Sequence, residues 1–348
     1  MQRRPRSTSI DVAALAGVSQ SAVSRAFTPG SVIAKNTREK VIAAANKLNY
    51  VPNSIASSLT TQRTNIVAII LGNLENPFYV EVLHTFSTRL QEQGRSVLTL
   101  TVEPDADTDE TILQLLKYQV DAVILTAAQL STRMTSLCHD RGIPIALFNR
   151  YIPGSDAYGV RCDNVAGGRQ IAEAFLAAGA KSFAMITGDP QGTTSQDRAR
   201  GFVERLLEAG LRRADIIQVE GKSSYDGAFN ATLELLRNNP DQRPDALFGI
   251  NDIMAMGAMD ALRYQLGLRI PEDIMVAGFD DIVEASRAPY QLTTVRQPVN
   301  KMVDATLAVL NLDDPNAPIE RGIDRPIEGR LMWRGTIPAP KNKAADGA

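Results

Sequence analysis

Short apolar runs alternate with amphipathic stretches along most of the chain. From residue 65 onward, the apolar runs NIVAIIL, SVLTLTV, DAVILTA and PIALFN are rich in β-branched residues. The stretches between them, such as VEVLHTFSTRLQEQG, repeat apolar residues with the period of a helix. Strands and helices that alternate in this way predict a parallel sheet with helices on both faces.

The same alternation then occurs a second time. The strands SFAMITG, IIQVEG, DALFGI and IMVAGFD are spaced by helical patterns such as DRARGFVERLLEAG and NDIMAMGAMDALRYQLG. Two series predict an α/β body of two similar, doubly wound lobes. Because ligands of such sheets bind beyond the C-terminal ends of the strands, we expect a ligand site in the cleft between the lobes.

The N-terminal region carries a different pattern, of three short helices without strands. Thr8 and Asp11 are expected to form a capping box at the start of a first helix, which ends at Ala16. Gly17 permits a tight turn, and Ser19 caps a second helix. The stretch NTREKVIAAANKLNY predicts a third, amphipathic helix. Because helices this short are marginal alone, we expect the three to pack together as an all-α helix-turn-helix head.

The charge is divided between these two regions. Residues 1–63 contain nine basic and two acidic side chains, a net charge of +7, whereas the whole chain carries −2, so the remaining residues carry −9. A basic head on an acidic body is typical of a nucleic-acid-binding domain attached to a second function. With 348 residues, the chain is also long enough for two or three domains.

The sequence lacks the signals that several other classes of protein would show. Cysteine and histidine occur only twice each, without the spacing of metal ligands, so we expect no metal and no cofactor. Cys138 lies beside His139, but the pair is expected to be part of a helix rather than a nucleophilic site. No apolar run could cross a membrane, and no signal peptide is apparent, which makes the cytoplasm the expected location.

Two rival functions share the α/β pattern. A nucleotide-dependent enzyme would need glycines that approach phosphates, yet the chain contains no G-x-G, no P-loop and no G-x-S-x-G elbow. We therefore expect that the protein is not an enzyme. A periplasmic sugar-binding protein would have the same two lobes, and the basic head and the missing signal peptide argue against it.

The N-terminal motifs closely resemble those of one family. DVAALAGVSQSAVSRAF, TREKVIAAANKLNYVPN and SIASSLTT follow one another over residues 8–62 as they do in the LacI/GalR family of bacterial transcription regulators. One departure is Ala34, where the family often has a capping Ser or Thr. The resemblance implies a DNA-binding repressor controlled by a small metabolite. It would act as a homodimer on a palindromic operator of about 14 to 20 base pairs.

The resemblance assigns roles to individual residues of the head. Gln20, Ser21 and Arg25 match positions that read base edges in the major groove, where Gln pairs with adenine and Arg with guanine. In the hinge, Ala56 matches a close-packing position and Leu59 matches a leucine that enters the minor groove. The residues that match phosphate contacts are Thr8, Ser19, Ser24, Thr37, Tyr50 and Asn53. For each of these six, a helix cap or a solvent-exposed polar residue is an equal alternative.

The body resembles the periplasmic-binding-protein-like core of the same family. The resemblance implies a head over residues 1–52, a hinge over 53–63, a core over 64–340 and a disordered tail over 338–348. The lobes would be joined by three crossovers, near residues 162–164, 295–298 and 326–329. The N-terminal lobe would comprise about 64–162 and 298–326, and the C-terminal lobe about 163–295 and 329–337. No leucine heptad follows the core, which favours a dimer over a tetramer.

The same likeness implies an effector site in the cleft. The matching residues are Phe78, Tyr79, Asn149, Arg198, Asn251, Asp252 and Asp280. Together they offer the carboxylate, amide, guanidinium and aromatic groups that a hydroxyl-rich ligand needs. Taken singly, Phe78 or Tyr79 fits the core equally well, and Asn149 or Asp280 fits a turn or helix cap. Lys222 occupies a loop where the family often has an aromatic residue. With Arg150 and Arg198 it would supply up to three cations, which favours a sugar acid or phosphorylated sugar over a neutral sugar.

Overall fold

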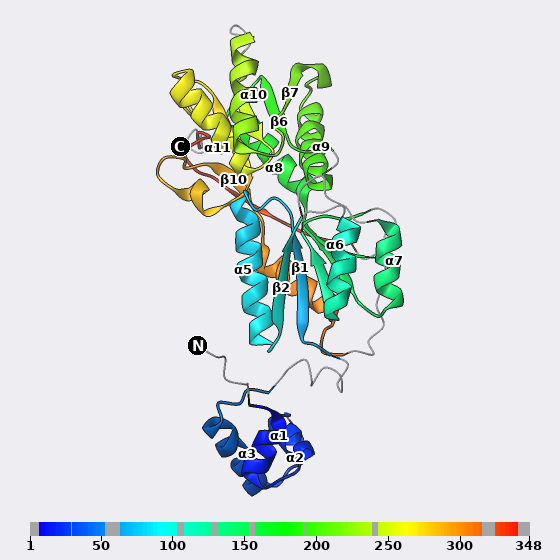
Figure 1. Cartoon of the computed structure of the whole chain (residues 1–348). Helices are drawn as coiled ribbons and strands as arrows, with labels where there is room; N and C mark the ends of the chain where they lie inside the picture. The colour runs from blue at the N-terminus through cyan, green and yellow to red at the C-terminus, as the bar shows by residue number, and fades with distance from the viewer. Residues whose placement is uncertain are drawn as a thin grey trace, which may run out of the picture. The chain divides into compact units, whose positions relative to one another are not determined.

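The structure is a computed structural model that describes residues 7–28, 30–52, 63–102, 108–126, 131–152, 157–190, 192–238, 243–314 and 324–339. The contacts divide the chain into two compact units, Met1–Thr64 and Asn65–Ala348 (Figure 1). The first unit is the helical head, and the second contains both sheets.

The head consists of three helices around a small apolar core. They are α1 (Ser9–Ala16), α2 (Gln20–Phe27) and α3 (Lys35–Lys47). The predicted capping box at Thr8 and Asp11 is confirmed, and Gly17 takes the left-handed conformation, with φ 66°, that ends α1. Val12, Val23 and Val41, one from each helix, are buried at the centre. The N-cap of α3 is Ala34, which provides no side-chain hydrogen bond, as expected.

The N-terminal lobe is built on a parallel six-stranded sheet in the order β11-β5-β4-β3-β1-β2. Its strands are β1 (Ile66–Leu71), β2 (Ser96–Thr101), β3 (Ala122–Leu125), β4 (Ile145–Phe148), β5 (Tyr158–Cys162) and β11 (Asp324–Ile327). The helices are α5 (Pro77–Glu92), α6 (Thr108–Leu115), α7 (Thr132–Asp140) and α12 (Val299–Leu310). Alternate residues of β1 face two separate apolar clusters, one with α5 and the other with α6, so helices cover both faces.

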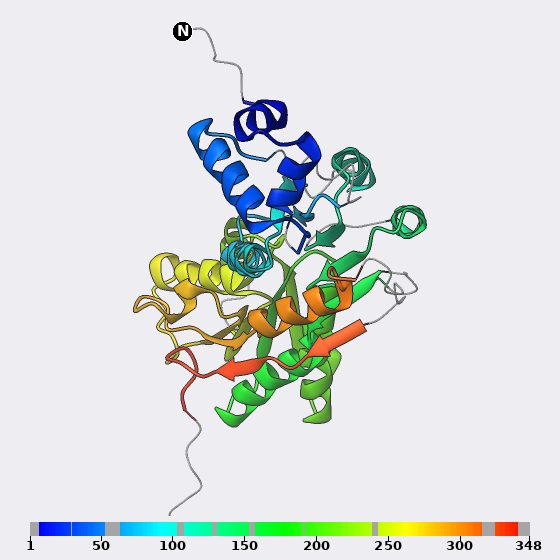
Figure 2. The ribbon, with the colours of Figure 1, turned by 90° about the horizontal axis from the view of Figure 1, so that it is seen from below.

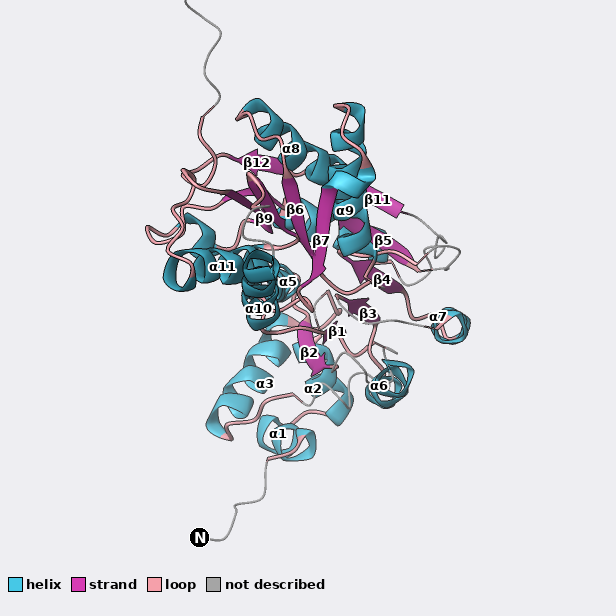
Figure 3. Ribbon diagram, turned by 90° about the horizontal axis from the view of Figure 1, so that it is seen from above, coloured by secondary structure: helices cyan, strands magenta, loops and turns pink. Residues whose placement is uncertain are grey.

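The C-terminal lobe has a second six-stranded sheet, in the order β12-β10-β9-β8-β6-β7. Its strands are β6 (Phe183–Thr187), β7 (Ile216–Glu220), β8 (Ala246–Gly249), β9 (Met275–Asp280), β10 (Thr293–Arg296) and β12 (Arg330–Met332). The helices are α8 (Asn164–Ala177), α9 (Thr193–Glu208), α10 (Tyr225–Asn238) and α11 (Asp252–Asp260). Figure 3 shows α8 and α9 on one side of this sheet and α10 and α11 on the other. The expectation of two α/β lobes is confirmed.

One strand departs from the parallel pattern. β12 pairs with β10 in the antiparallel direction, because only Glu328 and Gly329 separate it from β11 in the other lobe (Figure 2). A connection this short cannot turn the chain around. A Cβ at Gly329 would lie 2.9 Å from the Cys162 sulfur, so the crossing segments approach too closely for any larger residue. Cys162 itself ends β5, where the chain first leaves the N-terminal lobe.

Candidate functional site

Helix α2 presents one polar face and one apolar face. Ala22, Val23 and Ala26 are buried against α1 and α3. The exposed residues of the helix are Gln20, Ser21, Ser24 and Arg25. At about 100° per residue these four fall on the side opposite the buried three, so packing of the head leaves the predicted base-reading residues accessible.

Hydrogen bonds hold this polar face in place. Gln20 Nε2 donates to Ser9 Oγ at 2.9 Å, and Arg25 Nε donates to the Ser21 carbonyl oxygen at 3.4 Å. Ser19 Oγ accepts from the Ala22 amide at 3.3 Å and is the N-cap of α2. Both long side chains are therefore anchored at the N-terminal half of the helix, which is the part that enters the major groove in helix-turn-helix proteins.

The residues matched to phosphate contacts have structural roles in the head as well. Thr8 caps α1, and the Tyr50 ring lies 6.0 Å from the Phe27 ring, measured between centroids. Thr37 is half-buried in α3. Asn53, Ala56 and Leu59 lie outside the described residues, as do the predicted hinge up to residue 62 and the tail from residue 340.

The contact region between the two lobes is organised around one buried arginine from α9. Arg198 Nε donates to Asn164 Oδ1 at 2.9 Å, and Nη1 donates to the Ile250 carbonyl oxygen at 2.9 Å. Nη2 lies 3.0 Å from Asp280 Oδ1, and the guanidinium carbon lies 3.8 Å from the centre of the Phe279 ring. These contacts use both edges and one face of the guanidinium, so its position is fixed before any ligand binds.

Asp280 connects the two lobes at this point. Its Oδ2 accepts a hydrogen bond from Asn76 Nδ2 at 3.2 Å, and its Oδ1 accepts one from Gln297 Nε2 at 2.7 Å. Asn76 belongs to the N-terminal lobe, where it caps α5. Asp280 holds a φ of 128°, a strained value for a residue with a side chain. Burial raises the pKa of Asp280, while Arg198 opposes that shift.

The N-terminal lobe contributes a second group of predicted residues to the same contact region. Asn149 is buried, and its side chain lies close enough to Tyr79 to lower the pKa of that phenol. Burial raises the pKa of Tyr79. The charges of Arg150 and Arg198 lower that pKa, and the charge of Asp280 raises it. Burial lowers the pKa of Arg150, which lies close to Tyr79 and Asp189. Side chains from both lobes therefore meet in one region around Asp280.

Two buried acceptors in this region have no hydrogen-bond partner among the residues that the structure describes. They are Asn149 Oδ1 and Gln297 Oε1, on side chains that belong to residues only 3% exposed. A buried oxygen without a donor costs free energy, and a ligand that supplies hydroxyl hydrogens would remove that cost.

The other predicted effector residues have structural contacts. Phe78 is buried in the core of the N-terminal lobe, and Asn251 caps α11 by accepting from the Met254 amide at 2.9 Å. Lys222 is exposed, in a turn with φ 51°.

Asp252 is fully buried and accepts from Thr294 Oγ1 at 2.6 Å and from the Ile282 amide at 2.9 Å. Burial, and then the charge of Asp280, raise the pKa of Asp252 to about 7. The contact with Ile282 fixes the loop that directly follows Asp280, the last residue of β9.

The sequence did not predict four residues of this contact region. They are Asn76, Asn164, Phe279 and Gln297, which surround Arg198 and Asp280. Asn76 carried a local signal, because Asn before Pro begins a helix. Gln297 had no such signal, because the predicted crossover near 295–298 did not show which of its side chains would contact Asp280.

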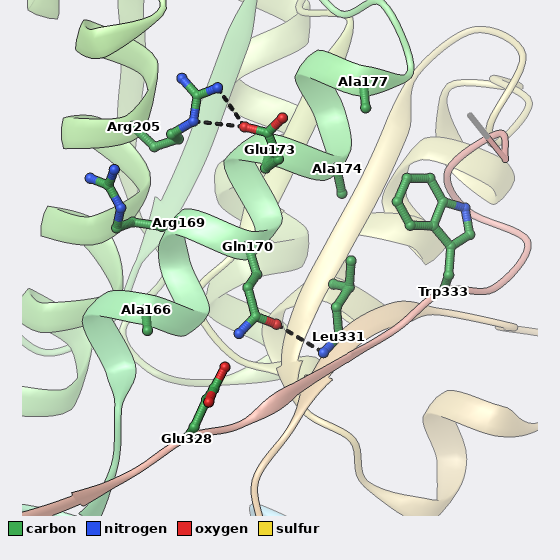
Figure 4. A pocket seen from close by; sticks show the side chains of 10 residues that line it. All are labelled: Ala166, Arg169, Gln170, Glu173, Ala174, Ala177, Arg205, Glu328, Leu331 and Trp333. Carbon is green, nitrogen blue, oxygen red and sulfur yellow. Dashed lines mark hydrogen bonds and ion pairs between the residues drawn. The ribbon is translucent and has the colours of Figure 1, made fainter. Parts of the chain in front are cut away.

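A separate groove lies on the outer side of the C-terminal lobe, between α8 and β12 (Figure 4). Its volume is about 500 Å³, and its floor includes Ala174, Leu331 and Trp333. Three of its charged side chains, Arg169, Glu173 and Arg205, already have partners. Arg205 pairs with Glu173 at 2.5 Å, and Arg169 pairs with Glu208 at 2.6 Å. The groove thus offers few polar groups to a ligand.

Comparison with known proteins identifies the family. Residues 10–53 match the model of the bacterial regulatory proteins of the lacI family, and residues 172–337 match that of a periplasmic binding protein-like domain. The HTH-type transcriptional regulator CelR of Thermobifida fusca is 32% identical over 341 residues, which cover 96% of this chain and 99% of CelR. This chain belongs to the LacI family. It is a DNA-binding transcription regulator with an effector-binding body.

Solved structures of LacI-family proteins have the same fold. The lac repressor dimer bound to operator and the anti-inducer ONPF has a TM-score of 0.84 and 25% identity, covering 95% of this chain and 99% of that one. A CelR–cellobiose complex has a TM-score of 0.67 and 29% identity, covering 96% and 100%. Such relatives are regulators and repressors, which confirms the expectation that the protein is not an enzyme. The family also excludes the two rival functions, a nucleotide-dependent enzyme and a periplasmic sugar-binding protein.

The family also sets the compartment. LacI-family proteins are soluble regulators of transcription, so the chain acts in the cytoplasm. Separately, none of the helices in the described part of the chain is long and apolar enough to span a membrane.

Proposed function

We propose that this LacI-family regulator is a homodimeric repressor whose hold on a palindromic operator is set by a sugar-like effector bound around Arg198 and Asp280. The observation that carries the proposal is the buried cluster at Asp280, which draws side chains from both lobes to one carboxylate. The domain division proposed from the sequence is kept, with the head over 1–52, the hinge over 53–63 and the core from 64. Two heads in one dimer require two symmetric half-sites.

Roles in DNA binding follow the accessible face of α2. Gln20, Ser21 and Arg25 are proposed to read bases, because they are exposed on the polar side of a helix whose other side is packed. The lac repressor structure supports the homodimer, since that relative is described as a dimer bound to operator. The roles of Ala56 and Leu59 in the minor groove remain predictions.

The charge of the cleft favours a neutral effector over an anionic one. Of the three cations considered from the sequence, Arg198 is balanced by Asp280, Arg150 lies near Asp189, and Lys222 is exposed. The two buried oxygens, which have no partner within the described part of the chain, are acceptors and call for hydroxyl donors. A carboxylate or phosphate would place further acceptors against them. CelR, described in complex with cellobiose, shows that a relative takes a neutral sugar.

A thermal-shift screen over sugars and sugar acids tests this proposal, because a ligand of the native state raises the melting temperature. Matched pairs, such as glucose with gluconate and a sugar with its phosphate, are then titrated by calorimetry. We expect the neutral member to bind more tightly, Asp280→Asn to abolish binding, and Glu328→Gln in the outer groove to preserve it. Tighter binding of the acid in every pair would reject the neutral class, and full binding by Asp280→Asn would reject the site.

A further inference from the structure

A second polar contact joins the two lobes. It does not include the residues around Arg198 and Asp280 to which we assign the effector, which we call the effector cluster. Arg161, on β5 of the N-terminal lobe, places Nη1 3.4 Å from Oδ2 of Asp197, on α9 of the C-terminal lobe. The first contact, between Asn76 and Asp280, belongs to the residues assigned to the effector. The Arg161–Asp197 ion pair uses none of those residues.

The N-terminal lobe holds Arg161 rigidly. Its Nε and Nη2 donate to the two carboxylate oxygens of Asp324 on β11, at 2.9 and 2.8 Å. The guanidinium carbon also lies 4.6 Å from the centre of the Tyr151 ring. A guanidinium bound on two sides by its own lobe has one remaining direction for Nη1, which is toward α9.

Asp197 depends on this contact for part of its charge compensation. Its side chain is only 3% exposed and has two cationic partners, Arg161 and Arg200, the second at 2.7 Å on the same helix. Burial raises the pKa of Asp197, and both arginines counteract that shift. A change in the angle between the lobes would remove Arg161 and leave Asp197 with one partner, which is unfavourable for a buried carboxylate.

Asp197 is directly linked to the effector cluster through α9. It precedes Arg198, the centre of that cluster, in the sequence. Helix α9 is also locked against α8, because a Cβ at Gly201 would lie 2.0 Å from the Val165 carbonyl oxygen and one at Gly168 would lie 2.2 Å from the Arg198 carbonyl oxygen. Arg198 and Asp197 are neighbours on this closely packed helix, so a shift of α9 at Arg198 also displaces Asp197.

We propose that Arg161 and Asp197 form a positioning pair that fixes the angle between the lobes and transmits changes at Arg198 to the N-terminal lobe. The proposal deepens the effector-controlled function given above, on which it rests. It does not depend on which ligand binds.

The lobe angle is measured in the full-length protein without ligand, by pulsed electron spin resonance between labels at Gln93→Cys on the N-terminal lobe and Ala209→Cys on the C-terminal lobe. Both positions are exposed. The native cysteines are buried, and burial raises the pKa of Cys138 to about 11 and that of Cys162 to about 12, so they resist labelling. Labelled chains are mixed with an excess of unlabelled chains, so that each distance is measured within one chain.

We expect Arg161→Gln and Asp197→Asn each to shift or widen the distance distribution, and Arg161→Lys to restore it in part. The matched control is Arg200→Gln, which removes the other partner of Asp197 within one lobe and should leave the distribution unchanged. Thermal unfolding checks that each variant folds. An unchanged distribution in a folded Arg161→Gln or Asp197→Asn protein would overturn the positioning role.

A second experiment tests whether changes at Arg198 reach the N-terminal lobe through Asp197. Arg198→Lys should shift the distance in the otherwise native protein but not when Asp197→Asn is also present. Equal shifts in both backgrounds would show that Arg198 acts on the lobes by another route. Because neither experiment uses a ligand, failure of the sugar screen and failure of the positioning pair give distinguishable results.

Discussion

The guanidinium of Arg198 contacts an amide oxygen, a backbone carbonyl, a carboxylate and an aromatic face at the same time. Its side chain is 6% exposed and that of its ionic partner Asp280 is 2% exposed. In our proposal, this buried ion pair with its supporting contacts positions groups for the effector. It also makes the core sensitive to the loss of either partner.

Replacing Arg198 with Met should therefore destabilise the body by about 3 to 5 kcal/mol, because Asp280 would stay buried without its cation. Urea unfolding measures the change. The double variant Arg198→Met/Asp280→Leu should recover part of the loss, and Arg169→Met, which breaks an exposed pair, should have little effect. A folded Arg198→Met protein as stable as the native chain would mean that the pair contributes nothing.

Asp252 should make stability depend on pH. Its pKa in the folded protein is raised from 3.8 to about 7, mainly by burial. A raised carboxyl pKa contributes stability that is fully present below the unfolded value and is lost as the pH rises through the folded value. Relative to the native protein, Asp252→Asn should become progressively more stable from about pH 4 to pH 8. A constant difference in melting temperature over that range would contradict the shift.

At this scale the sequence predicted some residues better than others. Arg198 and Asp280 were found because the family resemblance assigns a role to their positions. Gln297 and Asn76 were not, since their proximity to Asp280 exists only after two lobes and three crossovers have formed. The ion pair that balances the charge of Arg198 could not be predicted for the same reason. This pair changed the favoured effector from a sugar acid to a neutral sugar.

At the scale of elements, the head was predicted almost completely. The caps at Thr8 and Ser19 define helix starts by local hydrogen bonds, which can be read from sequence. The antiparallel direction of β12 was not predicted, because it follows from the short connection after β11, a tertiary feature. Likewise, nothing in the sequence told which helix Gly168 would contact.

The exposed face of α2 leads to a prediction about specificity. Arg25→Ala should cost about 1 to 3 kcal/mol at one base pair of the operator and flatten the preference there. Selection from a randomised DNA library measures the preference at each position. Lys47→Ala, at the end of α3, is the control and should weaken binding to all sequences alike, if at all. An unchanged preference in Arg25→Ala would show that α2 does not read DNA as proposed.

At the scale of the whole molecule, the division of charge between head and body matches the division between DNA binding and effector binding. The basic head suits DNA, and the acidic body contains the contacts between lobes and the residues to which we assign the effector. Control of one by the other requires that the effector bind more tightly to one of two states of the dimer. Asp280 and the Arg161–Asp197 pair are where those states would differ in contacts.

Operator affinity with and without the effector tests this account most directly. Fluorescence anisotropy would follow the selected operator in titrations with the native protein and with Asp280→Asn, each in the absence and presence of the sugar that most raises the native melting temperature. The account predicts that the sugar changes operator affinity of the native protein by about 5- to 150-fold and leaves that of Asp280→Asn unchanged. An equal change in both proteins, or no change in the native protein, would contradict it.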